Sequence, residues 1–264
     1  MTFHLMGGDR RQAMLARYIT EKGFPATLSY HKEDTPPAWD ADILILPLPA
    51  SKDGHTLHAP LAQKTIPLRE IYRRFEGKRI FGGMLPAGAP ANATDYYQAE
   101  EVLIANADAT AEGALALAIA QTPFMLAGSP ALVLGGGRIG RLLAAKLTAL
   151  HAKVTVAARR QETIAEARAL GCDARLYEDI PYHRFRLIFN TVPHEVLTEA
   201  RLQQLPHDAL LIELASAPGG FDAALAAEMG LPVCYAPGLP GKYSPETAAT
   251  ILGDYILKEM ERNG

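Results

Sequence analysis

The sequence predicts an α/β protein with two domains, and three observations carry that prediction. The chain has 264 residues, more than the roughly 100 to 200 that a single domain usually holds. Short apolar runs alternate with segments of helical periodicity along its whole length. Its 22 glycines and 19 prolines are scattered without a repeat, which indicates many tight turns between short elements. These features disfavour a single small core.

Composition and charge exclude several classes of protein. Hydrophobic residues make up 48% and charged residues 21% of the chain, which is typical of a folded globular protein. The formal net charge is −3 and no block of five like charges occurs, so we expect no nucleic-acid partner and no membrane surface. Cys172 and Cys234 are far apart and in no zinc-binding or CxxC spacing. We therefore expect no metal site, no disulfide and a cytoplasmic location.

Residues 1–107 are predicted to form the smaller, N-terminal domain. Its predicted strands are the apolar runs at 3–6 and 43–46 and the segment 78–81, which ends in Ile80-Phe81. The first run ends in Gly7-Gly8-Asp9 and leads into a segment of helical periodicity. The polar loop 51–65 leaves the end of a central strand, where ligands bind in open parallel sheets. We expect a flavodoxin-like α/β domain that binds the substrate or a partner.

Residues 108–243 are predicted to form the second domain, which begins with a helix over 110–121 that joins the two domains. The apolar stretch 102–120 overlaps this helix but is interrupted by polar residues such as Asp108, so we do not expect it to span a membrane. The predicted strands of this domain are the apolar runs at 131–134, 154–157, 187–189, 210–212 and 233–235.

A last helix is predicted over 244–262. Ser244 can cap this helix, and Pro245 fits its first position because a missing N–H costs nothing there. The apolar residues that follow recur at helical spacing on one face. We expect this helix to cross back and pack on the N-terminal domain.

A glycine-rich turn follows the first strand of the second domain. Gly135-x-Gly137-x-x-Gly140 comes after an apolar run and opens a helix, which is the context that a dinucleotide site requires. The first glycine permits the tight turn, the second lets the backbone approach a diphosphate, and the third lets helix and strand pack closely. Backbone N–H groups of the first helical turn, at Arg138 and Ile139, would bind the anion. The turn predicts a Rossmann-like domain with a doubly wound parallel sheet.

The end of the next strand favours NADP over NAD. An NAD site carries an acid about 20 residues after the glycines, but here the strand ends in Ala158-Arg159-Arg160, and no carboxylate appears before Glu162. Two guanidinium groups offer the fork geometry that suits a 2′-phosphate. The alternative is that both arginines are solvated residues at the start of a helix.

Three loops after later strands are predicted to line the same cleft. Asn190-Thr191-Val192-Pro193 follows one strand, and we expect contacts with the nicotinamide ribose. Leu214-Ala215-Ser216 follows another strand, and its small residues let backbone amides approach a ligand; we assign Leu214 and Ala215 to the cofactor and Ser216 to the substrate. Gly238, in a rigid loop of small residues after the last strand, is a further substrate candidate.

Four segments occur in a characteristic order. They are Gly7-Gly8-Asp9-Arg10-Arg11-Gln12, Thr110-Ala111-Glu112-Gly113, Asn190-Thr191-Val192-Pro193, and Ala236-Pro237-Gly238-Leu239-Pro240-Gly241 running into Thr247-Ala248. In this order and spacing the chain resembles one subunit of the enzyme dipicolinate synthase over nearly its full length. The first and last segments are the specific ones. The chain departs from this family at Ala217, where an arginine commonly stands, and in a shorter N-terminal domain.

The resemblance implies the dehydrogenase-like subunit of that enzyme. It implies NADP-dependent oxidation of dihydrodipicolinate, formed from 4-hydroxy-tetrahydrodipicolinate on a branch of lysine biosynthesis, to dipicolinate. It further implies that the partner is the second, flavoprotein-like subunit of dipicolinate synthase, and a place in the cytoplasm of the mother cell during sporulation. Association into a homo-oligomer stays open.

A cyclic dicarboxylate substrate needs two anion sites. Arg11 is the leading candidate for one, because its guanidinium can bind a carboxylate through two hydrogen bonds, and Asp9 and Gln12 could orient it. Lys52, with Ser51, is the second candidate. The alternative for Arg11 is a solvated arginine on a helix surface.

Glu112, together with Thr110, is predicted to lie near the reacting ring at the start of the helix that joins the domains. With Asp9 and Arg11 it completes the candidate catalytic set. A carboxylate at a helix N-terminus also stabilises the helix through its dipole, so a structural role is the alternative. Aromatisation supplies much of the driving force, so positioning can carry most of the catalysis.

Two other functions stay open. A 2-hydroxyacid or shikimate-type dehydrogenase shares the two-domain plan, although the segment after Tyr235 has no histidine to act as acid and base. A non-catalytic NADP-binding scaffold or sensor is the alternative from a different class.

Overall fold

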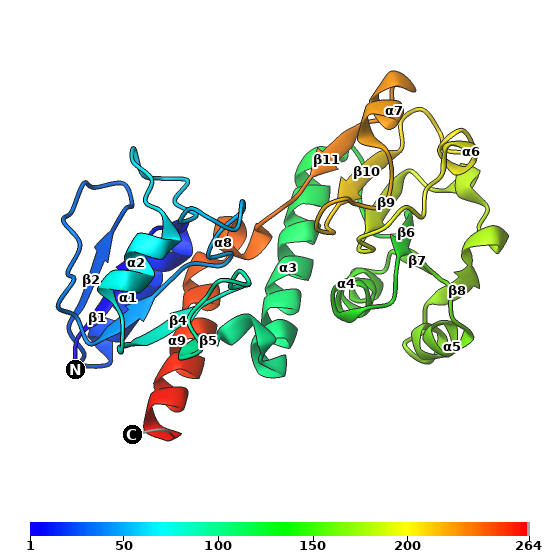
Figure 1. Cartoon of the computed structure of the whole chain (residues 1–264). Coiled ribbons are helices and arrows are strands. Elements are labelled where there is room, and N and C mark those ends of the chain that lie inside the picture. The colour runs from blue at the N-terminus through cyan, green and yellow to red at the C-terminus, as the bar shows by residue number, and fades with distance from the viewer. Residues whose placement is uncertain (263–264) are drawn as a thin grey trace. The chain divides into compact units, whose positions relative to one another are not determined.

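The structure of the protein is a computed structural model that describes residues 1–262 (Figure 1). It divides into two compact units. Unit 1 consists of Met1–Asn106 and the C-terminal segment from Pro240, and unit 2 consists of Ala107–Leu239. Both units are α/β, and each is built on its own parallel sheet. The predicted fold class is confirmed.

The sheet of unit 1 has five parallel strands in the order β2-β1-β3-β4-β5. The strands are β1 (Phe3–Met6), β2 (Ala26–Ser29), β3 (Ile43–Ile45), β4 (Arg79–Gly82) and β5 (Ala93–Asp95). The helices are α1 (Arg10–Glu21), α2 (Leu68–Arg74), the 3₁₀ helix η1 (Tyr96–Gln98) and α9 (Pro245–Arg262). This is the flavodoxin-like strand order. The direction in which successive strands are added to the sheet reverses between β1 and β3. Ligands in such sheets bind beyond the carboxyl ends of those two strands.

Successive side chains of β3 point to opposite faces of this sheet. Ile43 and Ile45 belong to the core that contains residues of α1 and α9, whereas Leu44 belongs to the core that contains residues of α2. The sheet is therefore covered on both faces, which explains why β3 is apolar at every position.

The C-terminal helix α9 packs on α1, as predicted. The two helices approach closely at Gly253, where an added Cβ would lie 2.4 Å from a ring carbon of Tyr18. The predicted start at Pro245 is also confirmed. The predicted cap is wrong, because the Ser244 hydroxyl is buried and has no hydrogen-bond partner among residues 1–262.

The sheet of unit 2 has six parallel strands in the order β11-β10-β9-β6-β7-β8. The strands are β6 (Pro130–Leu134), β7 (Lys153–Ala158), β8 (Asp173–Leu176), β9 (Leu187–Asn190), β10 (Leu210–Glu213) and β11 (Val233–Tyr235). The helices are α4 (Arg138–Ala149), α5 (Gln161–Ala169), α6 (Glu199–Leu202) and α7 (Ala223–Glu228), with 3₁₀ helices η2 (Tyr177–Asp179) and η3 (Tyr182–Arg184). The short helix α8 (Leu239–Tyr243) begins where the chain returns to unit 1. This is the doubly wound Rossmann order, with its switch point between β6 and β9.

The helix that the sequence predicts from residue 110 begins ten residues earlier in the structure. Helix α3 (Glu100–Gln121) has two glutamates in its first turn, where negative charge suits the helix dipole. Glu112 is thus in the interior of the helix and not at its N-terminus. Within residues 1–262, α3 is also the one helix long and apolar enough to cross a membrane; half of that stretch is buried, so the indication is weak.

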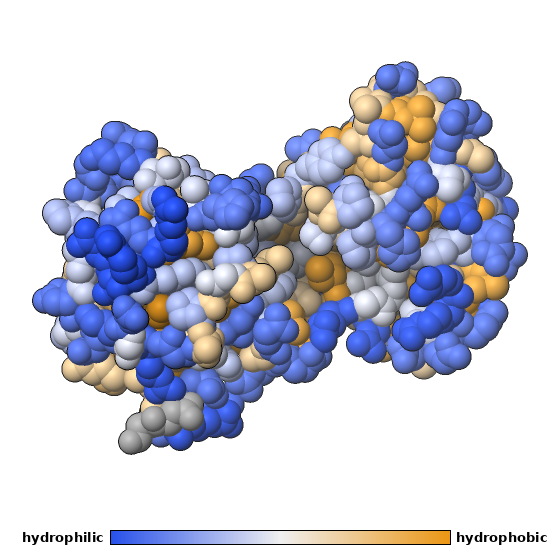
Figure 2. All heavy atoms as spheres, in the orientation of Figure 1, coloured by the Kyte–Doolittle hydropathy of each residue, from blue (hydrophilic) through white to orange (hydrophobic). Residues whose placement is uncertain are grey.

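Hydrophilic residues cover most of the visible face of both units, as Figure 2 shows. The large hydrophobic side chains that are exposed are spread along the chain, and scattered residues of this kind are normal at a protein surface. They are Met1, Met84, Ile104, Ile119, Met125, Leu150, Leu170, Tyr235 and Tyr243.

A buried histidine lies in the middle of the unit 1 sheet. The ring nitrogens of His4 on β1 lie 2.7 Å from the Thr27 hydroxyl and 2.9 Å from the Ser29 hydroxyl. Its ring stacks on Phe75, with 6.4 Å between the ring centroids. Burial lowers the pKa of His4 to about 4, although the charge of Asp40 opposes this. The folded protein therefore holds His4 neutral at a pH where the unfolded chain protonates it.

We expect unit 1 to lose stability as the pH falls from about 6.5 toward about 4, because the unfolded state binds the extra proton in that window. Between pH 7.5 and pH 5 the loss from His4 is about 2 kcal/mol. Urea unfolding followed by the fluorescence of Trp39 measures it, since Trp39 is the single tryptophan and its ring lies 6.0 Å from that of Phe75. In His4→Gln this part of the pH dependence should vanish; an unchanged pH dependence would exclude His4 as its source.

Candidate functional site

The turn after β6 assigns each glycine of the fingerprint a different role. Gly135 has φ +95°, and a Cβ there would lie 2.6 Å from the Thr191 hydroxyl, so the position requires glycine. A Cβ at Gly140 would lie 2.1 Å from the carbonyl oxygen of Gly135. Helix α4 can therefore approach the turn this closely only with glycine at both positions.

Gly137 differs from these two glycines because the space around it is open. A Cβ added to Gly137 would have no other atom of the described chain within 4 Å. Gly137 is also the N-cap of α4, and no side chain caps the N–H groups of the first turn. Free N–H donors at the positive end of a helix bind anions. The turn thus fits the diphosphate of a nucleotide.

A cavity of about 280 Å³ lies beside this turn. It is lined by Gly135, Gly136, Gly137, Ala158, Arg159, Arg160, Thr163, Tyr177, Thr191, Val192, Pro193 and His194. The structure thus brings together eight of the predicted cofactor residues. The other six, which do not line it, are Arg138, Ile139, Gly140, Asn190, Leu214 and Ala215. Contact of those six with a nucleotide stays a prediction.

The cavity carries positive charge at the end of β7. Arg159 and Arg160 are exposed, and neither forms an ion pair with any residue in 1–262. Burial raises the pKa of Tyr177 in the same cavity, while the charges of Arg201 and Arg159 oppose that rise. Tyr177 therefore stays protonated at neutral pH and can donate its hydroxyl beside two free guanidinium groups.

The side chain of Asn190 forms its hydrogen bonds within the protein. Its Nδ2 donates to the Val192 carbonyl at 2.9 Å and to Glu213 Oε1 at 2.7 Å, and its Oδ1 accepts from the Val192 N–H at 3.1 Å. Thr191 donates its hydroxyl to the Leu134 carbonyl at 2.8 Å. These bonds shape the loop after β9, whose residues Thr191, Val192 and Pro193 line the cavity.

Glu213 at the end of β10 is a buried organising residue that the sequence analysis missed. Its carboxylate accepts from the Asn190 amide, from the Ala215 N–H at 2.9 Å and from the Gly220 N–H at 2.9 Å. The signal in the sequence is an acid at the end of an otherwise apolar strand, followed by Gly219-Gly220. Ser216, in the loop that Glu213 holds, is exposed.

A second candidate site lies in unit 1, where β1 and β3 end at the switch point of the sheet. Gly7 and Gly8 have φ +67° and +78°, and a Cβ on Gly7 would lie 2.8 Å from the His58 carbonyl oxygen. The turn therefore requires glycine. It places Asp9 as the N-cap of α1, where its carboxylate accepts from the Arg11 N–H at 3.0 Å.

Arg11 is buried and held in place, unlike a solvated helix-surface arginine. Its Nη2 lies 2.8 Å from Asp9 Oδ2 and donates to the Leu48 carbonyl at 2.6 Å. Its Nε donates to Asp9 Oδ1 at 2.9 Å. Its Nη1 forms no hydrogen bond with residues 1–262. A Cβ on Gly241 would lie 2.3 Å from Asp9 Oδ2, so the two segments most specific to the resemblance meet at this ion pair.

Charge is concentrated around this ion pair. Burial raises the pKa of Asp9, but the hydrogen bonds and charge of Arg11 lower it by more. The charge of His58 also lowers it, so the pKa of Asp9 lies below its usual value. Burial lowers the pKa of His58, as do the charges of Lys52 and Arg11, against the opposing charge of Asp9. His58 is a second residue that the sequence analysis missed, because nothing nearby in sequence marks it.

The remaining unit 1 candidates have different surroundings. Gln12 is buried and donates its amide to the Ile45 carbonyl at 3.0 Å, so it ties α1 to the end of β3. Lys52 is exposed. Ser51 donates its hydroxyl to Asp53, whose carboxylate also accepts from the Thr56 N–H and thereby fixes the loop. Lys52 forms no ion pair with residues 1–262 and lies on a loop that these hydrogen bonds order.

Glu112 lies on the exposed face of α3 in unit 2. Its side chain is 64% exposed, and its carboxylate is 3.5 Å from the ammonium group of Lys146. Lys146 lies closer, at 3.0 Å, to Asp108, and that hydrogen bond raises the pKa of Lys146. Thr110 on the same helix is buried. Gly238 is exposed with φ +67° and open space around its Cα.

Within residues 1–262 the structure brings no three histidine, cysteine, aspartate or glutamate side chains close enough together to hold a metal ion. Cys172 and Cys234 are both free thiols.

Comparisons with known proteins agree with the resemblance found in the sequence. Residues 2–89 match the family model of the N-terminal domain of DpaA, a dipicolinate synthase subunit. The chain is 28% identical over 279 residues to the corresponding dipicolinate synthase subunit of Bacillus subtilis, covering 96% of this chain and 94% of the relative. Among solved structures, the same subunit from Bacillus halodurans matches with a TM-score of 0.82 at 26% identity and covers 97% of this chain and 96% of that chain.

More distant structures share the fold alone. One is the apo-structure of D-lactate dehydrogenase from Escherichia coli, at 13% identity and a TM-score of 0.61, with 100% of this chain and 98% of that chain covered. The architecture is therefore that of dehydrogenases.

Proposed function

Because this chain belongs to the DpaA family of dipicolinate synthase subunits and has a dehydrogenase-type fold, we propose that it is an NADP-dependent oxidoreductase that converts dihydrodipicolinate to dipicolinate. One observation carries the proposal. The open backbone at Gly137 adjoins a cavity that also holds the unpaired Arg159 and Arg160. A diphosphate and a 2′-phosphate need these two features in one place.

The reaction removes two hydrogens from the ring. A nicotinamide supplies a hydride acceptor when it is bound. The ring loses one hydride and one proton, and the product is the aromatic dicarboxylate, NADPH and H⁺. Aromatisation favours this direction, so the protein's task is to bind both carboxylates and to accept one proton.

Unit 1 is proposed to hold the substrate. Arg11 is preorganised because Asp9 fixes its guanidinium while Nη1 stays free, so a substrate carboxylate can bind there at little entropic cost. Lys52 supplies the second positive charge from the ordered loop after β3. Gln12 supports the site by tying α1 to β3. Ser51 completes the proposed substrate residues of unit 1, and Thr110, Ser216 and Gly238 of unit 2 stay separate candidates for substrate contact.

Two groups can accept the proton. Glu112 has a carboxylate on an exposed helix face, where water can carry the proton away. His58 is held neutral by burial and by the nearby charges of Lys52 and Arg11, and a neutral imidazole can accept a proton.

Glu112→Gln is expected to lower turnover more than it lowers NADP⁺ affinity, because the substitution keeps the shape of the side chain and removes its basicity. Steady-state rates and calorimetric NADP⁺ titration give the two quantities. His58→Gln, tested alongside, should leave turnover intact if Glu112 is the base. Equal loss of turnover and affinity in Glu112→Gln would assign Glu112 a structural role.

The family resemblance also supports a partner and a place in the cell. We propose that the chain acts in a complex with the flavoprotein-like subunit of dipicolinate synthase, in the cytoplasm of the mother cell during sporulation.

One assay tests the proposed reaction. The protein is mixed with NADP⁺ and the condensation product of pyruvate and aspartate semialdehyde, with and without the flavoprotein-like subunit. NADPH absorbance should appear together with the spectrum of a pyridine dicarboxylate. NADP⁺ binding without turnover under both conditions would instead support a non-catalytic scaffold or sensor.

A further inference from the structure

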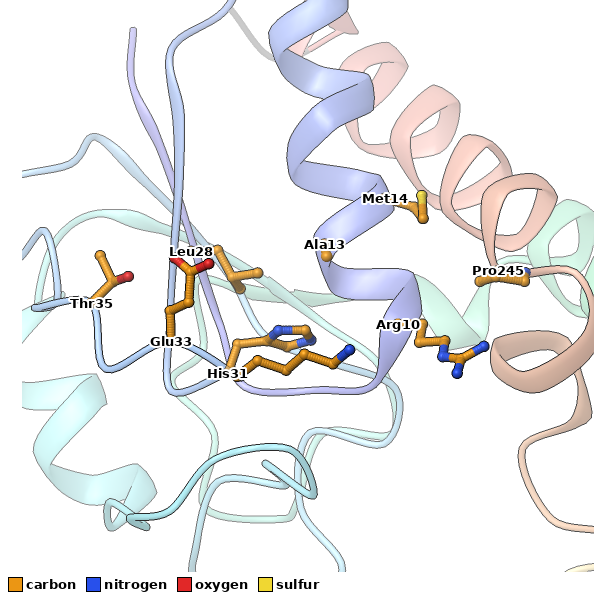
Figure 3. Close-up of a pocket in the computed structure, with 9 residues that line it drawn as sticks. Arg10, Ala13, Met14, Leu28, His31, Glu33, Thr35 and Pro245 are labelled. Carbon is orange, nitrogen blue, oxygen red and sulfur yellow. The ribbon is translucent and has the colours of Figure 1, made fainter.

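Unit 1 contains a larger cavity that the proposed function does not use. Its volume is about 550 Å³, within the range of small-molecule sites. It lies where β2 ends and where α1 and α9 begin, and Figure 3 shows Arg10 and Pro245 at the starts of those two helices. It is lined by Arg10, Ala13, Met14, Leu28, His31, Lys32, Glu33, Thr35 and Pro245.

Two cations in this cavity have no counterion. Arg10 and Lys32 are exposed, and neither forms an ion pair with any residue in 1–262, whereas Arg17 and Lys64 nearby in unit 1 both do. The one acid in the lining is Glu33. Figure 3 shows its carboxylate beside Leu28, on the opposite side of His31 from Arg10. The Arg10 end of the cavity is therefore electropositive.

The start of α9 adds to this positive end. The helix has 18 residues, and its N-terminal dipole end lies at Pro245, which lines the cavity. The preceding Ser244 hydroxyl is buried without a partner in residues 1–262, so it does not cap the free N–H groups of the first turn. In contrast, Asp9 caps α1 with its carboxylate. Glu246 in the first turn of α9 offsets part of this field, but it does not line the cavity.

The rest of the wall is apolar. Ala13, Met14, Leu28 and Pro245 are partly buried and give a surface on which a ring or short chain can pack. Small-molecule sites commonly combine such a wall with a few convergent polar groups.

This cavity is distinct from the Asp9–Arg11 site. Neighbouring residues on a helix do not share a face, and Arg10 is exposed whereas Arg11 is buried against Asp9 and the Leu48 carbonyl. One residue connects the two places, because a ring nitrogen of His31 lies 3.1 Å from the Asp9 carbonyl oxygen.

We propose that this cavity is a second ligand site of the protein, for a small organic anion. The carboxylate or phosphate group of the ligand binds Arg10 and Lys32 near the start of α9, and its apolar part packs on Met14 and Leu28. The site goes beyond the proposed redox function and does not depend on it.

Titration of the full chain with benzoate, phenyl phosphate and inorganic phosphate tests the proposal, with backbone amide shifts recorded by NMR. Benzoate or phenyl phosphate should shift the amides of residues 10–14 and 28–35 and should bind more tightly than inorganic phosphate. The tighter of the two organic probes identifies the anionic group. Equal affinity for inorganic phosphate would overturn the organic part of the proposal.

Variants locate the binding. Arg10→Gln and Lys32→Gln should each raise the Kd of the organic probe about tenfold, the factor that each 1.4 kcal/mol of lost interaction gives. Lys22→Gln, at the other end of α1, is the matched control and should change nothing. All three side chains are exposed, so folding should not be affected. An equal loss in Lys22→Gln, or shifts confined to residues 48–58 around Lys52, would refute the second site.

Discussion

Replacing Gly137 with aspartate is expected to abolish nucleotide binding while leaving the fold intact. The new side chain meets open space, since a Cβ at this position has no protein atom within 4 Å. The φ of −71° is ordinary for any residue, and aspartate is a favoured N-cap. The carboxylate would occupy the place proposed for the diphosphate, and such like-charge contact costs several kcal/mol. Calorimetric titration should show the Kd for NADP⁺ rise at least about a thousandfold.

The matched control for this variant is Gly88→Asp. Gly88 also has open space around its Cα and no left-handed backbone angle, but it lies in unit 1. This variant should bind NADP⁺ with the affinity of the parent chain. Both variants should have the melting temperature of the parent chain. Unchanged affinity in Gly137→Asp would show that no nucleotide approaches this turn.

Arg159→Asp is expected to reverse the cofactor preference. Removing a guanidinium that binds a 2′-phosphate forfeits a charge-assisted hydrogen bond, and the new carboxylate repels the phosphate, so NADP⁺ affinity should fall about a hundredfold. Affinity for NAD⁺ should rise, because a carboxylate at the end of the second strand accepts hydrogen bonds from the ribose hydroxyls. Parallel titrations with the two nucleotides measure both changes.

Arg184→Asp makes the same change in charge at an exposed position of unit 2 outside the cavity. It should alter neither affinity. If NADP⁺ affinity were the same in Arg159→Asp and in the parent chain, the assignment of the 2′-phosphate to this arginine would be wrong.

The central strands of both sheets were predictable because they are buried on both faces and so read as continuous apolar runs. Strands β2 and β5 are the edges of the unit 1 sheet. Neither is fully buried, and Ala26–Ser29 and Ala93–Asp95 carry no apolar run. Edge strands of this kind leave a weak trace in a sequence.

The early start of α3 was missed for a different reason. Asp108, in the middle of the helix, has low intrinsic helix propensity and looks like a break. In the structure its carboxylate lies 3.0 Å from the ammonium group of Lys146 on α4. A contact between residues 38 positions apart in the chain is invisible to local periodicity.

The candidate nucleotide site was largely readable because its glycines are constrained locally, by a φ of +95° at Gly135 and by close packing at Gly140. The hydrogen bonds between Asn190 and Glu213 could not be predicted in this way, because they join the ends of two strands that are distant in the sequence. For the same reason the sequence suggested Asp9 and Arg11 as partners but did not reveal His58, which comes from a distant loop.

The most direct test of the account is a crystal structure of the protein with NADP⁺. The account predicts the diphosphate against the backbone N–H groups that follow Gly137 and the 2′-phosphate within hydrogen-bond distance of Arg159 or Arg160. A nucleotide bound elsewhere, or crystals that contain saturating NADP⁺ and show solvent beside Gly137, would contradict it.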